Sequence, residues 1–267
     1  MITLSLPSPP ATSTLPRRFE PAPRPRATLT SVRWAADEAD LRAAQRLRYQ
    51  VFAEELGATL SPPPGTPAGH DADLFDPFCE HLLAIAGDQV VGTYRVLTAD
   101  AARRAGSFYL ETEFDLFRLR GRRDGLVELG RACVHPDWRR GGTMLALWGG
   151  LFGFMDRNRF AAVIGAASVG ARDGGGAALA LWARLAREHL APPELQVLPR
   201  RRLPVEAPAP GGDLATPALI QGYLRCGGRL IGEPAWDPDF QVADLPMMLR
   251  LRDLPAAYAR HFSNGAA

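Results

Sequence analysis

The sequence predicts a mixed α/β fold, in which helices lie on both sides of a mixed central sheet. Apolar residues make up 46% of the 267 residues and aromatic residues 8%, which is enough to build a buried core. Segments with strand periodicity alternate along the chain with segments of helical periodicity. The segment Phe160–Ser168 is apolar throughout, as expected for a strand that is covered on both faces.

Charge and cysteine content exclude several classes of protein. The net charge is only +2, so there is no global field for nucleic acid, and we predict no nucleic-acid partner. Every cation is arginine, which excludes lysine Schiff-base chemistry. The 3 cysteines cannot form a disulfide framework and indicate a reducing compartment. We find neither a secretory signal nor an apolar run of the ~18 residues that a spanning helix needs, so a cytoplasmic protein is expected.

The N-terminal residues 1–27 differ in composition from the rest of the chain. They are rich in proline, serine, threonine and arginine, which predicts a flexible arm. A weak contact of this arm with a membrane or RNA is the alternative. Residues 28–267 are expected to form one domain, with loops at the proline-rich stretches Ser61–Gly69 and Leu203–Pro217.

The first elements follow from alternation and from capping residues. Thr28–Trp34 alternates as a strand does. Asp37–Leu56 has helical periodicity, with Asp37 or Asp40 as the N-cap and Gly57 as the stop signal.

The remaining elements are shorter apolar runs and amphipathic segments. His81–Ala86 and Val90–Leu97 flank a Gly-Asp-Gln turn and predict a hairpin. The further strands are Leu126–Val134, Phe160–Ser168 and Asp244–Leu251, and the further helices are Thr143–Arg157, Asp173–Leu190, Pro217–Cys226 and Leu254–Phe262.

Two arginines stand on apolar faces. Arg48 falls on the apolar stripe of the first helix, and Arg95 lies inside the second strand of the hairpin. A buried arginine needs a carboxylate partner, unless it reaches solvent at an edge. The acidic loop before the hairpin is the nearest source of partners: Asp71, Asp73, Asp76 and Glu80. This loop could equally be solvated, or it could hold a cationic substrate with spare negative charge.

The strand Leu126–Val134 contains two charges, Glu128 and Arg131. A regular strand would place them on opposite faces. Gly130 lies between them, and a glycine inside a strand often marks a bulge, which would bring both charges to one side. Such a pair is either a structural ion pair or a catalytic base with a residue that orients it.

The turn after this strand is typical of an anion-binding site. Val134 is followed by a basic, glycine-containing turn with Arg139 and Arg140, which leads directly into a helix. Free N–H groups at a helix start and nearby arginines both favour a phosphate. Zinc binding by the two Cys-x-His pairs, Cys79 with His81 and Cys133 with His135, does not fit a standard spacing, and we predict no metal.

These residues resemble a known family. The motif Val134-x-Pro136-x-x-Arg139-x-x-Gly142 is similar to the acyl-donor motif of the GNAT N-acyltransferase superfamily. Further motifs over roughly residues 30–262 resemble the bacterial L-ornithine Nα-acyltransferases, also called hemolysin-like acyltransferases, and more distantly the acyl-homoserine-lactone synthases. These motifs are Leu47-Arg48-Tyr49-x-Val51-Phe52-x-Glu54-Glu55, Asp73-x-Phe75-Asp76-x-x-Cys79-Glu80-His81, Gly92-Thr93-Tyr94-Arg95, Phe108-Tyr109-x-x-Thr112-Glu113-Phe114-Asp115, Glu128-Leu129-Gly130-Arg131-x-Cys133-Val134-His135-Pro136 and Gly222-Tyr223-Leu224-Arg225.

The resemblance implies both a fold and a reaction. The fold would be GNAT-like, with a mostly antiparallel central sheet flanked by helices and a splayed strand pair that forms the acyl-donor cleft. The reaction would transfer a 3-hydroxy fatty acyl or fatty acyl group from acyl carrier protein to the α-amino group of L-ornithine, giving lyso-ornithine lipid. The acyl group would arrive on the phosphopantetheine of the carrier, so no bound cofactor is expected.

The resemblance also implies roles for individual residues. Glu128 would be the base, and the other catalytic positions would be Arg131, Arg95 and Asp76. Substrate-binding positions would be Arg48, Phe52, Asp73, Phe108 and Trp148, with Phe108, Trp148 and Phe152 lining an acyl tunnel. Positions that bind the acyl donor would be Cys133, Val134, Arg139, Arg140, Gly141 and Gly142, with a backbone N–H near Cys133 or Val134 for the oxyanion.

Several alternatives stay open from the sequence. The chain could be a signal synthase that acylates S-adenosylmethionine, or it could acylate lysine, glutamine or glycine. It could also be a non-catalytic module that binds lipid or carrier. Peripheral contact with the inner membrane is left open as well.

Overall fold

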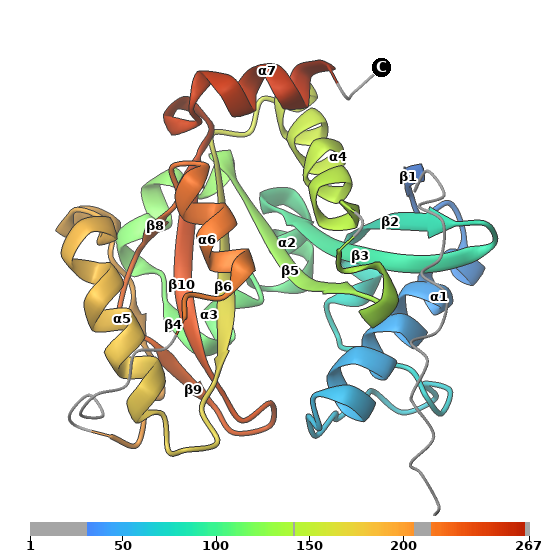
Figure 1. Ribbon diagram of the computed structural model, residues 1–267, viewed down its shortest axis with the longest axis horizontal. Helices are drawn as coiled ribbons and strands as arrows, with labels where there is room; N and C mark the ends of the chain where they lie inside the picture. Colours follow the sequence, from blue (N-terminus) through green and yellow to red (C-terminus); the bar gives the residue numbers. More distant parts are fainter. Residues whose placement is uncertain (1–30, 141, 206–214, 265–267) are drawn as a thin grey trace, which may run out of the picture.

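The computed structural model describes residues 31–140, 142–205 and 215–264. The predicted arm, residues 1–27, lies outside this part of the chain. In the described part, an eight-stranded sheet runs through the centre of the molecule, and helices cover both of its faces (Figure 1). The mixed α/β fold predicted from the sequence is confirmed.

The sheet is antiparallel at every strand pairing but one. The exception is the parallel pair of β5 and β6 near its middle. Across the sheet, the strands are β1 (Ser31–Trp34), β2 (Glu80–Ala86), β3 (Gln89–Thr98), β5 (Leu126–Val134), β6 (Ala162–Gly170), β10 (Val242–Arg250) and β8 (Arg229–Leu230), while β9 (Ala235–Asp237) pairs with one end of β10. A separate ribbon joins β4 (Phe114–Asp115) to β7 (Leu198–Pro199).

The strands β5 and β6 pair over a short length and then separate. Their register covers only Leu126–Glu128 against Ala162–Ile164. Beyond this point, β5 stays with β3 and β6 stays with β10, so the two strands diverge visibly in Figure 1. The splayed pair implied by the family resemblance is therefore present.

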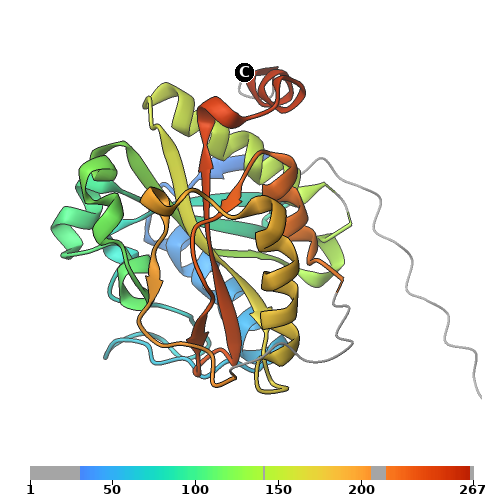
Figure 2. The same ribbon diagram turned by 90° about the vertical axis from the view of Figure 1, so that its left-hand side faces the viewer.

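Two groups of helices cover the two faces of the sheet. The helices α4 (Thr143–Arg157), α5 (Gly176–His189) and α6 (Ala218–Arg225) lie on one face, and α7 (Ala256–Asn264) packs beside α4. The helices α1 (Glu38–Tyr49), α2 (Ala99–Ala105) and α3 (Leu110–Glu113) lie on the other face, followed by the 3₁₀ segment η3 (Phe117–Gly125). Figure 2 shows this second layer and the layer of α4, α5 and α6 on opposite sides of the sheet.

The elements with strong local signals lie close to their predicted limits. β5 and α4 have the predicted bounds, and the side chain of Asp37 caps α1 by accepting from the N–H of Asp40. The first helix differs from the prediction because its α-helical part ends at Tyr49, and the turn Gln50–Glu55 is wound as a π-helix. The short helices α2 and α3 were not predicted from the sequence.

Among residues 31–140, 142–205 and 215–264, no helix combines the length and the apolar character needed to cross a membrane.

Candidate active site

A buried ion-pair cluster ties α1 to the acidic loop. The side chain of Arg48 is fully buried, and its Nε and Nη2 atoms lie 2.8 and 2.7 Å from the carboxylates of Asp71 and Asp76. Gln45 of α1 donates to Asp76 as well, at 2.9 Å. The carboxylate partner that a buried arginine requires is therefore supplied by the loop, as one of the alternatives predicted.

The second strand of the hairpin joins the same cluster. Nη1 of Arg95 lies 2.6 Å from Asp73 and 2.9 Å from Asp76. Burial opposes the ionisation of Asp76, but the charge of Arg48, its hydrogen bonds and the charge of Arg95 hold the pKa of this carboxyl well below its usual range. Asp76 is thus a permanent anion that two arginines share.

Arg131 of β5 completes the cluster. Its Nη2 atom lies 3.1 Å from Asp73, and its Nε atom lies 3.6 Å from Asp71. Three arginines, at positions 48, 95 and 131, therefore face three aspartates, at positions 71, 73 and 76. The three aspartates are therefore balanced and carry no spare negative charge, while Glu80, the fourth acid of the predicted loop, is exposed and lies outside the cluster.

The bulge predicted in β5 is present, one residue beyond the predicted glycine. Gly130 pairs with Arg95, and Cys133 pairs with Thr93, so two residues of β5 stand opposite one residue of β3. Arg131 occupies the left-handed region with φ 49°, a conformation that costs a non-glycine residue roughly 1–2 kcal/mol. The bulge turns the guanidinium of Arg131 toward Asp73.

Glu128 is held by the backbone rather than by Arg131. Its two carboxylate oxygens accept hydrogen bonds from the N–H groups of Tyr109 and Leu110, both at 2.8 Å, where α3 begins. Among the described residues no hydrogen bond or ion pair joins Glu128 to Arg131, so the predicted orienting role of Arg131 is wrong in its geometry. The reason is that the bulge sends Arg131 to the aspartates.

The environment of Glu128 suits a general base. Glu128 is only 4% exposed, and burial raises its pKa to about 7, although the charge of Arg95 and the two backbone hydrogen bonds act in the opposite direction. A carboxyl group that titrates near the working pH can both accept and release a proton efficiently.

The register of β5 against β3 directs one backbone N–H toward the opening between β5 and β6. The N–H of His135 donates to the carbonyl of Val91 at 2.8 Å. Hydrogen-bonded pairs alternate along an antiparallel ladder, so Cys133 is the next residue of β5 that bonds to β3. The N–H of Val134 therefore points to the side that β6 has left, which makes Val134 the better of the two predicted oxyanion donors.

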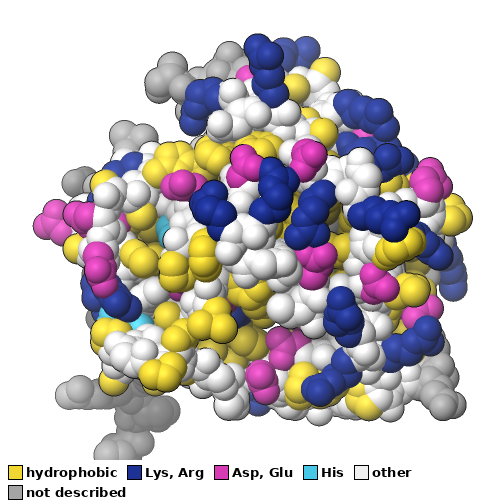
Figure 3. Space-filling model, turned by 180° about the vertical axis from the view of Figure 1, so that it is seen from behind, with side chains coloured by type: hydrophobic (Ala, Val, Ile, Leu, Met, Phe, Trp, Pro, Cys, Tyr) yellow, Lys and Arg dark blue, Asp and Glu magenta, His cyan; other side chains and the backbone are white. Residues whose placement is uncertain are grey.

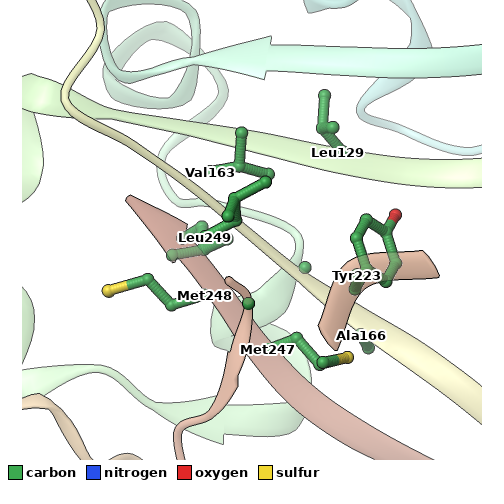
Figure 4. Close-up of a pocket in the computed structure, with 10 residues that line it drawn as sticks. Leu129, Val163, Ala166, Tyr223, Met247, Met248 and Leu249 are labelled. Atoms are coloured by element: carbon green, nitrogen blue, oxygen red, sulfur yellow. The ribbon is translucent and has the colours of Figure 1, made fainter. Parts of the chain in front are cut away.

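Apolar side chains line two adjoining pockets at this opening, on the side of α4 and α6. In the first pocket, Leu129 of β5 faces side chains from β6, β10 and α6, including Tyr223 (Figure 4). The second pocket is lined by Trp148 and Phe152 of α4 and shares Leu129 and Tyr223 with the first. The predicted positions Trp148 and Phe152 thus line one apolar region with Leu129, whose side chain lies on the face of β5 opposite to that of Glu128.

The other two predicted aromatic positions lie elsewhere. Phe108 is buried on the α3 side of the sheet, with its ring 4.5 Å from the guanidinium of Arg123, so its predicted place beside Trp148 is wrong. The sheet separates these two residues because Phe108 packs beneath η3. Phe52 is half-buried and meets Phe240 edge to face at 5.8 Å.

The turn before α4 is only partly available to an anion. Arg139 makes a two-pronged ion pair with Glu55 at 2.7 and 2.6 Å, which occupies its guanidinium. Arg140 is exposed and has no hydrogen bond or ion pair among the described residues. Gly142 precedes α4 with φ 81°, a conformation that suits glycine, while the predicted Gly141 lies outside the described residues.

Comparisons with known proteins show which family and which fold this chain shares. Residues 47–149 match the family model described as acetyltransferase (GNAT) domain. The chain is 39% identical to the L-ornithine N(alpha)-acyltransferase of Rhodobacter capsulatus over 82% of this chain and 88% of that protein. It is 34% identical to the enzyme of the same name from Rhizobium meliloti, over 88% of this chain and 84% of that protein. A solved CoA-dependent acyl-homoserine lactone synthase, BjaI, shares the fold with a TM-score of 0.52 at 15% identity, covering 88% of each chain.

Proposed function

Because this chain belongs to the L-ornithine N(alpha)-acyltransferase family, we propose that it transfers a fatty acyl or 3-hydroxy fatty acyl group from acyl carrier protein to the α-amino group of L-ornithine. The product would be lyso-ornithine lipid. The observation that carries the proposal is Glu128, a buried carboxyl with a pKa of about 7 beside the opening between β5 and β6.

The proposed reaction begins with proton removal at the acceptor. An amino acid enters with its α-amino group protonated, and the carboxylate of Glu128 takes one proton to give a neutral amine. The nitrogen attacks the thioester carbon, and the N–H of Val134 stabilises the oxyanion that forms. The C–S bond then breaks, the departing thiolate takes the second proton from nitrogen, and Glu128 releases the first proton to solvent. The net products are amide, thiol and one proton.

The acyl chain and its carrier would occupy the side of the sheet that bears α4. The pockets beside Trp148 and Phe152 are apolar, which suits a fatty acyl chain, but each has a volume of about 10 Å³, so their side chains must move apart to admit one. The exposed guanidinium of Arg140 stands at the start of α4, where it could pair with the phosphopantetheine phosphate. Arg139 would take part only if its ion pair with Glu55 opens.

Peripheral membrane contact is a separate part of the proposal. The face that η3 covers carries many arginine side chains (Figure 3). Phe117 at the start of η3 is 62% exposed, and the guanidinium of Arg120 lies 4.1 Å from its ring. Exposed aromatic and cationic groups together favour anionic membrane surfaces. Binding to phosphatidylglycerol vesicles but not to phosphatidylcholine vesicles, with loss in Arg120→Glu, would support this contact, and equal binding to both would refute it.

A direct assay decides the main proposal. The purified protein is incubated with 3-hydroxyacyl carrier protein and, in separate reactions, with ornithine, lysine, glutamine, glycine and S-adenosylmethionine. We expect an N-acyl amide by mass spectrometry from ornithine, formed faster with the carrier than with the matching acyl-CoA. A lactone from S-adenosylmethionine, or no amide from ornithine, would refute the proposed reaction.

A further inference from the structure

Three carboxylates converge beside the proposed base. They are Glu113 at the end of α3, Asp237 at the end of β9 and Asp244 in β10, and one oxygen from each lies within 4.8 Å of the others. Glu113 is far in the sequence from the other two residues, which lie on the consecutive strands β9 and β10. Only the pairing of β9 with β10, together with the packing of α3 against the sheet, brings them together.

Within the described part of the chain, this acidic cluster has no cation paired to it, although the charge of Arg131 acts on Glu113 and Asp244 from a greater distance. Among the described residues, none of the three carboxylates has an ion pair within 4 Å, because the nearby Arg131 is turned to Asp71 and Asp73. Asp244 accepts one hydrogen bond from Ser168, and Asp237 accepts from two backbone N–H groups of its own turn. The cluster therefore contrasts with the balanced arginine–aspartate cluster next to it.

One oxygen of the cluster has no partner of any kind. Oε2 of Glu113 is shielded from solvent and accepts no hydrogen bond within the described part of the chain. Burial, followed by the charges of Asp244 and Asp237, holds the pKa of Glu113 well above its usual range. Burial likewise raises the pKa of Asp244 to about 6, although Ser168 opposes this rise. A buried acceptor without a donor, among like charges, is the site that a cationic ligand would complete.

We propose that Glu113, Asp237 and Asp244 bind the side-chain ammonium group of the acceptor amino acid. This inference rests on the proposed function, because it assigns the second amino group of a diamino acid to a site of its own. The balanced cluster of Asp73 and Asp76 does not take that role, since its three arginines already neutralise it.

The spacing of the two sites fits a diamino acid. The N-terminal end of α3 holds Glu128 through the N–H groups of Tyr109 and Leu110, and the last residue of this helix is Glu113. Three residues of helix rise separate Leu110 from Glu113 by about 5 Å along the axis. The two amino nitrogens of an extended ornithine are roughly 6 Å apart across five covalent bonds. The charge of Glu128 also contributes to the raised pKa of Glu113, which shows that the two carboxylates are near each other. The length of ornithine is therefore compatible with one acceptor that spans Glu128 and the cluster.

The experiment compares acceptors that differ only in the side-chain ammonium. Norvaline has the carbon chain of ornithine without the δ-amino group, and lysine carries the ammonium one methylene further out. Wild-type protein, Asp237→Asn, Glu113→Gln and the control Asp239→Asn are assayed with each acceptor at saturating carrier. Asp239 is exposed and lies in the same turn as Asp237, but its carboxylate is outside the cluster.

We expect Asp237→Asn and Glu113→Gln to raise the KM for ornithine roughly 10- to 100-fold, the size of one lost hydrogen bond to a charged group. The KM for the carrier and kcat/KM for norvaline should stay near the wild-type values, as should every constant of Asp239→Asn. Both amide variants should melt at or above the wild-type temperature, because each removes repulsion between buried carboxylates. Asp237→Asn also retains an oxygen for the backbone N–H groups of its turn.

Two outcomes would overturn the inference while leaving the proposed function intact. In the first, the wild-type protein acylates ornithine but both amide variants keep the wild-type preference for ornithine over norvaline. In the second, Mg²⁺ or Mn²⁺ raises the melting temperature of the wild type but not of Asp237→Asn, whereas ornithine shifts neither, which would make the cluster a metal site. If the wild type does not acylate ornithine at all, the proposed function itself is wrong.

Discussion

Replacing Glu128 with glutamine tests the proposed base most directly. The variant keeps the shape of the side chain and removes its ability to take a proton. Loss of general-base help lowers a rate by roughly 10²- to 10⁴-fold, so we expect kcat for ornithine to fall by at least the smaller factor. The KM for the carrier should change little, because the acyl pockets beside Leu129 and Trp148 are untouched.

The pH dependence of the wild type follows from the same residue. Glu128 must be ionised to act, and its pKa in the free protein is about 7, so kcat/KM should rise roughly tenfold per pH unit below 7 and bend near 7. Glu128→Gln should lack this bend. The amine of a free amino acid titrates at higher pH, so its contribution appears above the bend.

The free energy of unfolding should fall as the pH rises, which is opposite to the change in activity. Since folding raises the pKa of Glu128 from 4.5 to about 7, the folded protein binds this proton more tightly than the unfolded chain does. The favourable contribution is therefore present below pH 4.5 and is lost as the pH rises through 7, by roughly 3 kcal/mol in total. Glutamine at this position removes the dependence of stability on pH. Its amide, however, turns one N–H₂ group toward a backbone N–H, and the lost hydrogen bond lowers the free energy of unfolding by about 1–3 kcal/mol. The variant should thus be less stable than the wild type at pH 5 and close to it at pH 8.

Glu111→Gln is the matched control. Glu111 accepts from the N–H of Phe108, one residue before the two that hold Glu128, and pairs with Arg123 at 2.7 Å. The control therefore alters a carboxylate at the same helix start without touching the proposed base. Stopped-assay kinetics and urea unfolding at pH 5, 7 and 8 measure both effects. A Glu128→Gln variant with more than half of the wild-type kcat, or a wild-type profile without a bend near 7, would refute the assignment.

Three further variants probe the surrounding structure. Asp76→Asn leaves Arg48 and Arg95 short of negative charge, so the free energy of unfolding should fall by roughly 3–5 kcal/mol. The melting temperature should then fall by on the order of 10 °C. An unchanged melting temperature would show that the cluster is not structural. Arg140→Glu should raise the KM for the carrier and make this KM less dependent on salt concentration. Arg157→Glu, at the far end of α4, should change neither. Equal effects of the two variants would refute the proposed phosphate site at Arg140. Trp148→Phe enlarges the acyl pocket, so the enzyme should come to prefer carriers that bear longer acyl chains. An unchanged preference would show that the acyl chain binds elsewhere.

The sequence showed which arginines need a carboxylate partner, but it showed only some of the residues that supply one. An arginine on an apolar stripe needs a carboxylate whatever the fold, so Arg48 and Arg95 already indicated ion pairs with the acidic loop. That Arg131 would join them could not be predicted, because its direction depends on where the bulge falls in the register of β3 against β5. A shift of one residue reverses the face of every side chain that follows.

The sequence by itself determined the elements and the chemistry-bearing positions. Local periodicity located α4 and β5, and the motif around Glu128 identified the proposed base. Only the tertiary structure decided what surrounds that base. The N–H groups of Tyr109 and Leu110 hold Glu128, burial brings its pKa to about 7, and an unbalanced acidic cluster stands at the other end of α3. The physical reason is that periodicity is set by neighbours a few residues away, whereas burial and charge balance are set by segments that meet only when the sheet has formed.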